Sequence, residues 1–178
     1  MMPVVIPVVG GKKSGKTSTI ELLVKELAHR GYRVAVAKHI PEPDFTIDTD
    51  GKDTWRFGQA GAKIVVGVSS GEVATIEKVH TASFSVDDIL RPCRDADIVF
   101  LEGFRRQIAA EKHFQKIAVV KSAGDAREAV DTFEPILAFA GSYNTEMDYP
   151  AIPYVDVSRN QKKLADIIEN LVEERVVT

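Results

Sequence analysis

Hydrophobic and polar positions along the chain follow the rhythm typical of an α/β protein. The continuous apolar run at residues 4–9 predicts a strand buried on both faces, as in a parallel sheet. Apolar positions then recur at helical spacing over residues 18–30, and residues 33–38 return to a strand pattern. Strand, helix and strand within about 35 residues predict a βαβ unit with parallel strands and a right-handed crossover.

The rest of the chain continues this rhythm with one interruption. Residues 62–68 and 72–76 flank the turn Ser69-Ser70-Gly71 and predict an antiparallel hairpin, preceded by a short helix for which Asp53 is the expected N-cap. The other predicted elements are strands at 97–103, 116–121, 135–140 and 151–156, the last a short edge strand, and helices at 86–94 and 160–175. We therefore expect an α/β fold of the P-loop NTPase type in a single domain over residues 1–178, with a mostly parallel sheet flanked by helices and an antiparallel hairpin.

A glycine-rich segment connects the first predicted strand to the first helix. Gly10, Gly15, Lys16 and Thr17 fit the spacing Gly-x-x-x-x-Gly-Lys-Ser/Thr of the phosphate-binding loop. Small residues let successive backbone N–H groups surround a phosphate, and the helix that follows offers unpaired N–H groups and a positive dipole end. Lys16 would neutralise the β- and γ-phosphates, and the Thr17 hydroxyl would bind Mg²⁺. The residues expected to contact the nucleotide here are Gly11, Lys12, Lys13, Ser14, Gly15, Lys16, Thr17 and Ser18. The alternative is a glycine-rich turn that matches this spacing by coincidence. It would not explain why a buried strand precedes the segment and a helix follows it.

A second informative strand ends in an acid. Residues 97–101 are mostly apolar and lead into Glu102 and Gly103, the form of a Walker B element, whose acid holds Mg²⁺ or orients the attacking water. Glu102 is thus a candidate catalytic residue with Lys16 and a candidate metal ligand with Thr17, and Gly103 would allow close approach to the γ-phosphate. The alternative is an exposed acid at a strand end. Arg105 and Arg106 add positive charge, either to the site or as a solvated patch.

Other polar residues are expected at the same edge of the sheet. Lys38 and His39 end the second predicted strand, and the carboxyl ends of parallel strands are where open α/β folds bind ligands. The loop at residues 40–50 is long for a connector and leads into Lys52 and Asp53, which favours a role in ligand binding. Alternatives remain open: His39 as an ordinary strand-end histidine, and Asp53 as a helix cap.

Lys121 and Asp125 follow another buried strand. A lysine and a nearby aspartate resemble the Asn-Lys-x-Asp element that reads guanine in GTPases, but the asparagine is missing and the spacing is wide. A plain surface turn therefore stays open beside a base-reading role.

Composition narrows the classes of function. The net charge of −3 gives no general attraction to nucleic acid or anionic membranes. One cysteine excludes an internal disulfide and a cysteine-rich metal site. The N-terminal apolar run, about seven residues, is too short to span a bilayer and lacks the flanks of a signal peptide, so we expect a cytoplasmic protein.

Taken together, these motifs resemble the MobB family of molybdopterin-guanine dinucleotide biosynthesis proteins. The phosphate loop is shared by many families, whereas Lys38-His39, the segment Asp48-x-x-Gly51-Lys52-Asp53-Thr54 and Glu102-Gly103-Phe104 are more specific in combination. The resemblance implies a GTP- and Mg²⁺-binding accessory protein with weak GTPase activity. It also implies three partners: the MobA-type guanylyltransferase that joins GMP to molybdopterin, molybdopterin or its metal form, and a second copy in a homodimer whose antiparallel segments pack across subunits.

Two other functions use a phosphate loop. A small-molecule kinase would need a lid helix with several arginines, which the sequence does not show. A GTPase metallochaperone calls for a Cys- or His-rich tract, and four histidines with one cysteine do not form one.

Overall fold

The computed structural model describes residues 2–143 and 149–177, and their contacts group into two compact units. The first comprises Met1–His39 and Ser85–Thr178, and the second comprises Ile40–Phe84. The expectation of one domain stays a prediction. In the described ranges no helix is long and apolar enough to cross a membrane.

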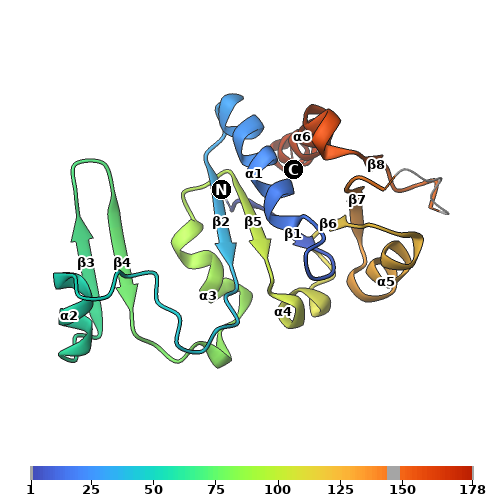
Figure 1. The fold of residues 1–178 in the computed structure, drawn as a ribbon. Coiled ribbons are helices and arrows are strands. Elements are labelled where there is room, and N and C mark those ends of the chain that lie inside the picture. The colour runs from blue at the N-terminus through green and yellow to red at the C-terminus, as the bar shows by residue number, and fades with distance from the viewer. Residues whose placement is uncertain (1, 144–148, 178) are drawn as a thin grey trace. The chain divides into compact units, whose positions relative to one another are not determined.

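The first unit is built on a six-stranded sheet in which every neighbouring pair of strands is parallel (Figure 1). The strand order is β2-β5-β1-β6-β7-β8. The strands are β1 (Val4–Val9), β2 (Val34–Lys38), β5 (Ile98–Glu102), β6 (Lys116–Val119), β7 (Ile136–Ala140) and β8 (Tyr154–Val155). The predicted parallel sheet is therefore confirmed, including the short edge strand at its end.

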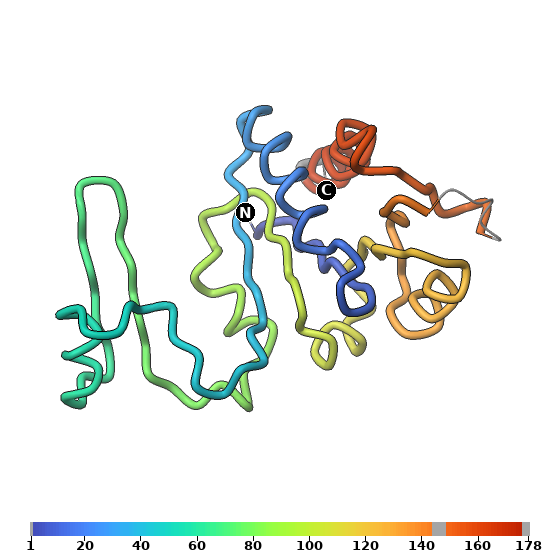
Figure 2. The backbone as a smooth tube through the Cα atoms, viewed as in Figure 1, coloured from blue at the N-terminus to red at the C-terminus, as the bar shows by residue number. Residues whose placement is uncertain are grey.

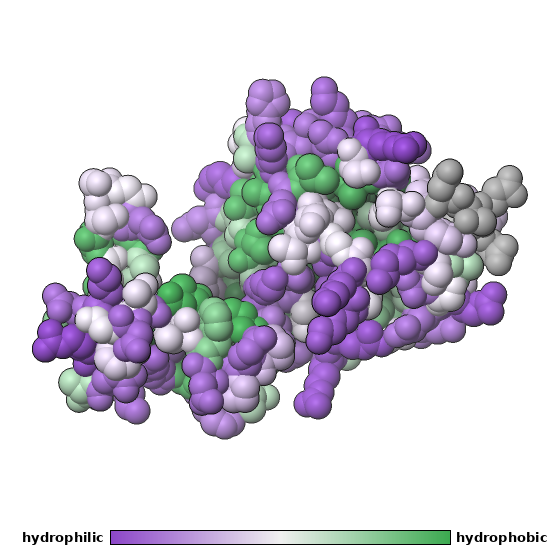
Figure 3. Space-filling view, in the orientation of Figure 1, coloured by the Kyte–Doolittle hydropathy of each residue, from purple (hydrophilic) through white to green (hydrophobic). Residues whose placement is uncertain are grey.

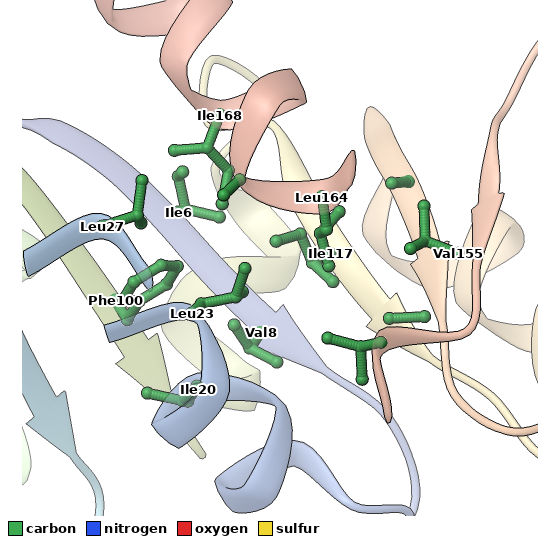
Figure 4. Close-up of a cluster of buried hydrophobic side chains, with 14 of the residues drawn as sticks. Ile6, Val8, Ile20, Leu23, Leu27, Phe100, Ile117, Val155, Leu164 and Ile168 are labelled. Carbon is green, nitrogen blue, oxygen red and sulfur yellow. The ribbon is translucent and has the colours of Figure 1, made fainter. Parts of the chain in front are cut away.

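Two helices, α1 (Lys16–His29) and α6 (Val157–Val177), cover one face of this sheet and lie side by side (Figures 1 and 2). Their buried residues Leu23, Leu27 and Ile168 meet Ile6 and Phe100 of the central strands (Figure 4). Burial of a side chain of this size contributes roughly 1.5–3 kcal/mol, so this contact anchors the helix that begins at the phosphate loop.

Three shorter helices cover the opposite face: α3 (Val86–Leu90), α4 (Arg105–Ala110) and α5 (Ala123–Phe133). The 3₁₀ turn η2 (Arg91–Cys93) extends α3, because Pro92 lacks the N–H that an α-helix would use. Ile108 and Phe133 are buried here against the second set of strand side chains, such as Val99 and Phe139. Successive residues of a strand point to opposite faces of the sheet, and helices cover both faces. This explains the continuous apolar runs in the sequence.

Two helices of this face were absent from the sequence prediction. The segment at Lys121 to Asp125 was expected to be a turn or a base-reading element, but Ser122 caps α5 there, and its hydroxyl accepts from the Asp125 N–H at 3.1 Å. The pattern Ser-x-x-Asp is a helix-start signature that could have revealed it. Helix α4 has six residues, too few for a periodic signal in the sequence.

The second unit contains α2 (Asp53–Gln59), the strands β3 (Ile64–Val68) and β4 (Val73–Glu77), and the 3₁₀ turn η1 (Thr81–Ser83). The two strands pair antiparallel, which confirms the predicted hairpin. The expectation that Asp53 caps α2 was wrong by one residue: Lys52 is the N-cap, with extended backbone and no side-chain cap bond. Asp53 lies in the first turn, where its charge still complements the helix dipole.

Candidate functional site

The strand register places three predicted site residues at one edge of the sheet. Glu102, the last residue of β5, is aligned with Val8 of β1 on one side and with Lys38 of β2 on the other. The phosphate loop leaves β1 one residue after Val9, so the loop, the acid and the lysine meet at the carboxyl ends of adjacent parallel strands. Sequence reasoning anticipated this edge but not the alignment of Lys38 with Glu102.

The phosphate loop adopts backbone conformations that require its glycines. Gly10 has φ +143°, and a side chain there would overlap the Val119 carbonyl oxygen at the end of β6. Gly15 has φ +101° and forms the N-cap of α1 in a left-handed conformation, and Lys13 has φ +57°. Mixed right- and left-handed residues of this kind turn backbone N–H groups toward a common centre and form an anion-binding nest.

The start of α1 is left open for an anion. No side chain caps it, and no acidic residue lies in its first turn. A side-chain oxygen at the cap commonly accepts from one of the first N–H groups of a helix, and Gly15 has no side chain to do so. The unpaired N–H groups and the positive dipole end therefore have no competing partner from these positions.

The Lys16 side chain contacts the backbone of the phosphate loop. Its Nζ donates to the carbonyl oxygens of Gly10 at 3.1 Å and Gly11 at 2.7 Å. Burial lowers the pKa of the Lys16 ammonium; the Glu102 carboxylate opposes this effect, and the charges of Lys38 and Lys121 add to it. The ammonium thus lies beside the loop in a partly desolvated position, where its attraction to a phosphate would be stronger than in water.

Thr17, Glu102 and Lys38 form one cluster of polar contacts. The Thr17 hydroxyl lies 2.9 and 3.1 Å from the two carboxylate oxygens of Glu102. Lys38 Nζ lies 3.3 Å from Thr17 Oγ1 and 3.4 Å from Glu102 Oε1. A hydroxyl and a buried carboxylate form an all-oxygen donor pair of the kind that Mg²⁺ prefers, with water and phosphate oxygens completing its shell. The residues present therefore fit the expected metal, and Thr17 and Glu102 would hold it.

Gly103 and His39 pack closely against each other next to this cluster. The His39 N–H donates to the Glu102 carbonyl at 2.8 Å, which continues the β2–β5 ladder by one step. A side-chain carbon at Gly103 would lie 3.2 Å from His39 Cβ, and Gly103 has φ +89°. The His39 and Phe104 rings then meet edge to face at 5.8 Å between centroids. Close packing against His39 thus explains why a residue without a side chain occupies position 103, which the sequence did not suggest.

A cavity of about 300 Å³ opens at the phosphate loop. Its walls are Lys13, Ser14, Gly15, Lys16, Thr17, Ser18 and Glu102, all predicted from the sequence. The exposed residues Gly11 and Lys12 belong to the same loop, and Lys38 and His39 are exposed at the neighbouring strand end. Lys52 and Asp53 lie in the second unit, where Asp53 pairs with Arg56 at 3.4 Å, and their role as ligand contacts stays a prediction.

Two other candidates are engaged elsewhere. Arg105 pairs with Glu128 at 2.8 Å and lies over the Phe133 ring at 4.9 Å, so it contacts α5. The Asp125 carboxylate accepts from the Lys121 N–H at 2.8 Å as part of the helix start. Asp125 thus has a structural role at the start of α5, which favours a structural role over base reading.

The sequence pattern of the family Molybdopterin guanine dinucleotide synthesis protein B, MobB, matches residues 5–142 of this chain. The chain belongs to the MobB family. A relative from Haemophilus influenzae, described as a molybdopterin-guanine dinucleotide biosynthesis adapter protein, is 30% identical over 92% of this chain and 86% of its own length. A Methanocaldococcus jannaschii protein, described as a putative adapter protein of the same biosynthesis, is 34% identical over 80% of this chain, and the match spans 57% of that longer protein.

Solved MobB structures share the fold. A crystal structure of molybdopterin-guanine biosynthesis protein B superimposes with a TM-score of 0.71 at 28% identity, covering 95% of this chain and 99% of that one. A MobB homologue from Bacillus stearothermophilus gives a TM-score of 0.64 at 22% identity, covering 96% and 98%. The predicted P-loop NTPase fold and the predicted family are both confirmed.

Proposed function

We propose that this MobB chain binds GTP with Mg²⁺ at the phosphate loop and acts as an accessory protein when GMP is attached to molybdopterin. The observation that carries the proposal is the contact between Thr17 and Glu102 beside the uncapped start of α1. The N–H groups of the loop and Lys16 would bind the β- and γ-phosphates. Bound Mg²⁺ would neutralise charge that develops on the phosphates, and hydrolysis would be slow.

The neighbouring strand ends supply the rest of the proposed binding surface. Lys38 and His39 lie at the same edge as the loop, and both are exposed. They are the proposed contacts for phosphates of GTP or for the terminal phosphate of molybdopterin. Lys52 of the second unit is proposed separately as a contact for such a phosphate, and Asp53 stays a proposed ligand contact. The name "adapter protein" given to the two relatives supports a role beside a guanylyltransferase of the MobA type rather than in place of it.

A phosphate-release assay tests this function. The protein is mixed with GTP and Mg²⁺, or with ATP and Mg²⁺, with and without candidate acceptors and the guanylyltransferase with molybdopterin. We expect slow release from GTP that no acceptor accelerates, and a higher yield of dinucleotide when the protein is added to the transferase. Rapid acceptor-dependent turnover would instead identify a kinase, and a strong preference for ATP would contradict the proposal.

We also propose that the β3–β4 hairpin joins two copies of the chain. One face of its strands exposes Ile64, Val66, Val68 and Val73, each more than half exposed, and Figure 3 shows hydrophobic green on the hairpin. In the described residues these two strands pair only with each other, so each keeps an open edge. An isolated hairpin is marginally stable, and open apolar strands favour association.

Val66→Glu should disrupt this homodimer. A charge in the middle of the exposed face would be desolvated at the interface, which should raise the dimer dissociation constant by at least about tenfold. Analytical ultracentrifugation over a concentration series measures this shift. Ser70→Glu adds the same charge at the exposed turn and should leave the constant unchanged. Equal behaviour of the two variants would contradict an interface on this face.

A further inference from the structure

The Lys38 ammonium lies against the two residues that fit the metal. Its Nζ is 3.3 Å from Thr17 Oγ1 and 3.4 Å from Glu102 Oε1, while Thr17 and Glu102 contact each other at 2.9 Å. A cation therefore already lies against the hydroxyl and the carboxylate that would bind Mg²⁺. This contact follows from the strand register, which aligns Lys38 with Glu102.

The charge of Glu102 explains why a cation is held there. Its side chain is only 10% exposed, and an unpaired carboxylate at such a position is costly. Lys16 also interacts electrostatically with Glu102, but it directs its Nζ to the carbonyls of Gly10 and Gly11. Among the described residues, the ion pair of Glu102 is thus the one with Lys38.

Lys38 and a bound Mg²⁺ cannot share this position. Mg²⁺ binds oxygen at about 2.0–2.1 Å, so it would lie between the same oxygen atoms that Nζ now contacts. Two positive charges a few ångströms apart in a partly buried site repel strongly. The Lys38 side chain is half exposed and has a flexible four-carbon stem, so it can leave at little cost.

We propose that Lys38 competes with the metal for Glu102. In the metal-free protein the Lys38 ammonium pairs with Glu102, and when Mg²⁺ takes its place the ammonium turns to the terminal phosphate. The inference rests on the proposed GTP·Mg²⁺ site and adds a regulation to it. After release, the ammonium stays tethered at the end of β2, beside the phosphate loop, and the γ-phosphate is the anion it would meet. Metal binding and recognition of a triphosphate are then coupled through one side chain.

A metal titration without nucleotide tests the first half. Mn²⁺ shares the oxygen ligands of Mg²⁺, and electron paramagnetic resonance measures its free concentration. Removal of the competing charge in Lys38→Met should tighten Mn²⁺ binding by about three- to tenfold. Lys38→Arg, which keeps the charge, should stay near the wild-type affinity. Lys25→Met removes the same charge from the exposed face of α1 and should also leave the affinity unchanged.

The outcomes separate a specific competitor from general electrostatics. Equal tightening in Lys38→Met and Lys25→Met would overturn the proposal, as would unchanged or weaker Mn²⁺ binding in Lys38→Met. Failure of Mn²⁺ to bind either the wild type or Lys38→Met would overturn it too. Because no nucleotide is present, these results are independent of whether the protein binds GTP.

A nucleotide titration at saturating Mg²⁺ tests the second half. The ratio of GDP to GTP dissociation constants should fall by about three- to tenfold in Lys38→Met, because the γ-phosphate loses a charged partner. Lys25→Met should keep the wild-type ratio. An unchanged ratio in Lys38→Met would overturn the phosphate step, whereas a wild-type protein that binds no guanine nucleotide would contradict the proposed function itself.

Discussion

Lys16→Ala is expected to weaken GTP binding by about 10- to 150-fold, since a charge-assisted contact to phosphate contributes about 1.5–3 kcal/mol. The variant also loses the Nζ contacts to the Gly10 and Gly11 carbonyls, which hold the loop in the free protein. Titration with a fluorescent GTP analogue measures the affinity, and circular dichroism checks the fold, which should stay intact. Lys25→Ala is the control for charge. Unchanged affinity in Lys16→Ala would show that the site is placed wrongly.

Gly10→Ala is expected to destabilise the folded protein by about 3 kcal/mol. This is the upper end of the cost of a strained backbone conformation, because the added side chain also clashes with a neighbouring backbone atom. The new carbon would overlap the Val119 carbonyl, and φ is +143°. Gly11 offers a matched control one residue away, because a carbon added there meets no heavy atom within 4 Å. Gly11→Ala should change the free energy of unfolding by less than about 0.5 kcal/mol.

Urea denaturation of the two variants gives the comparison directly. The predicted order is Gly11→Ala close to wild type and Gly10→Ala far below it. If the two free energies of unfolding were equal, the packing of the loop on the end of β6 would be wrong. The result would also bear on the site, because this contact fixes where the loop begins.

The sequence was enough to predict the sheet and the phosphate loop, because both depend on local patterns. Apolar runs identify β1 and β5, and the spacing of Gly10, Gly15 and Lys16 identifies the loop. Parallel strands then bring their carboxyl ends to one edge, which was enough to group Glu102 with the loop.

Features that depend on register or on short helices were not predicted. The pairing of Lys38 with Glu102 follows from the alignment of β2 and β5, and no single segment carries that information. Gly103 was interpreted as a glycine that admits a phosphate, whereas the structure shows its close contact with His39. Helix α5 was not predicted, because the polar residues at its start, Ser122 to Asp125, are also typical of a surface turn.

The central claim is that this loop binds a guanine nucleoside triphosphate with Mg²⁺. Competition against a bound fluorescent GTP analogue, with GTP and ATP as competitors and Mg²⁺ present or absent, tests it most directly. We expect GTP to displace the analogue at a concentration at least about tenfold lower than ATP, and Mg²⁺ to strengthen binding. Equal displacement by ATP, or no binding of the analogue by the intact wild-type protein, would contradict the claim.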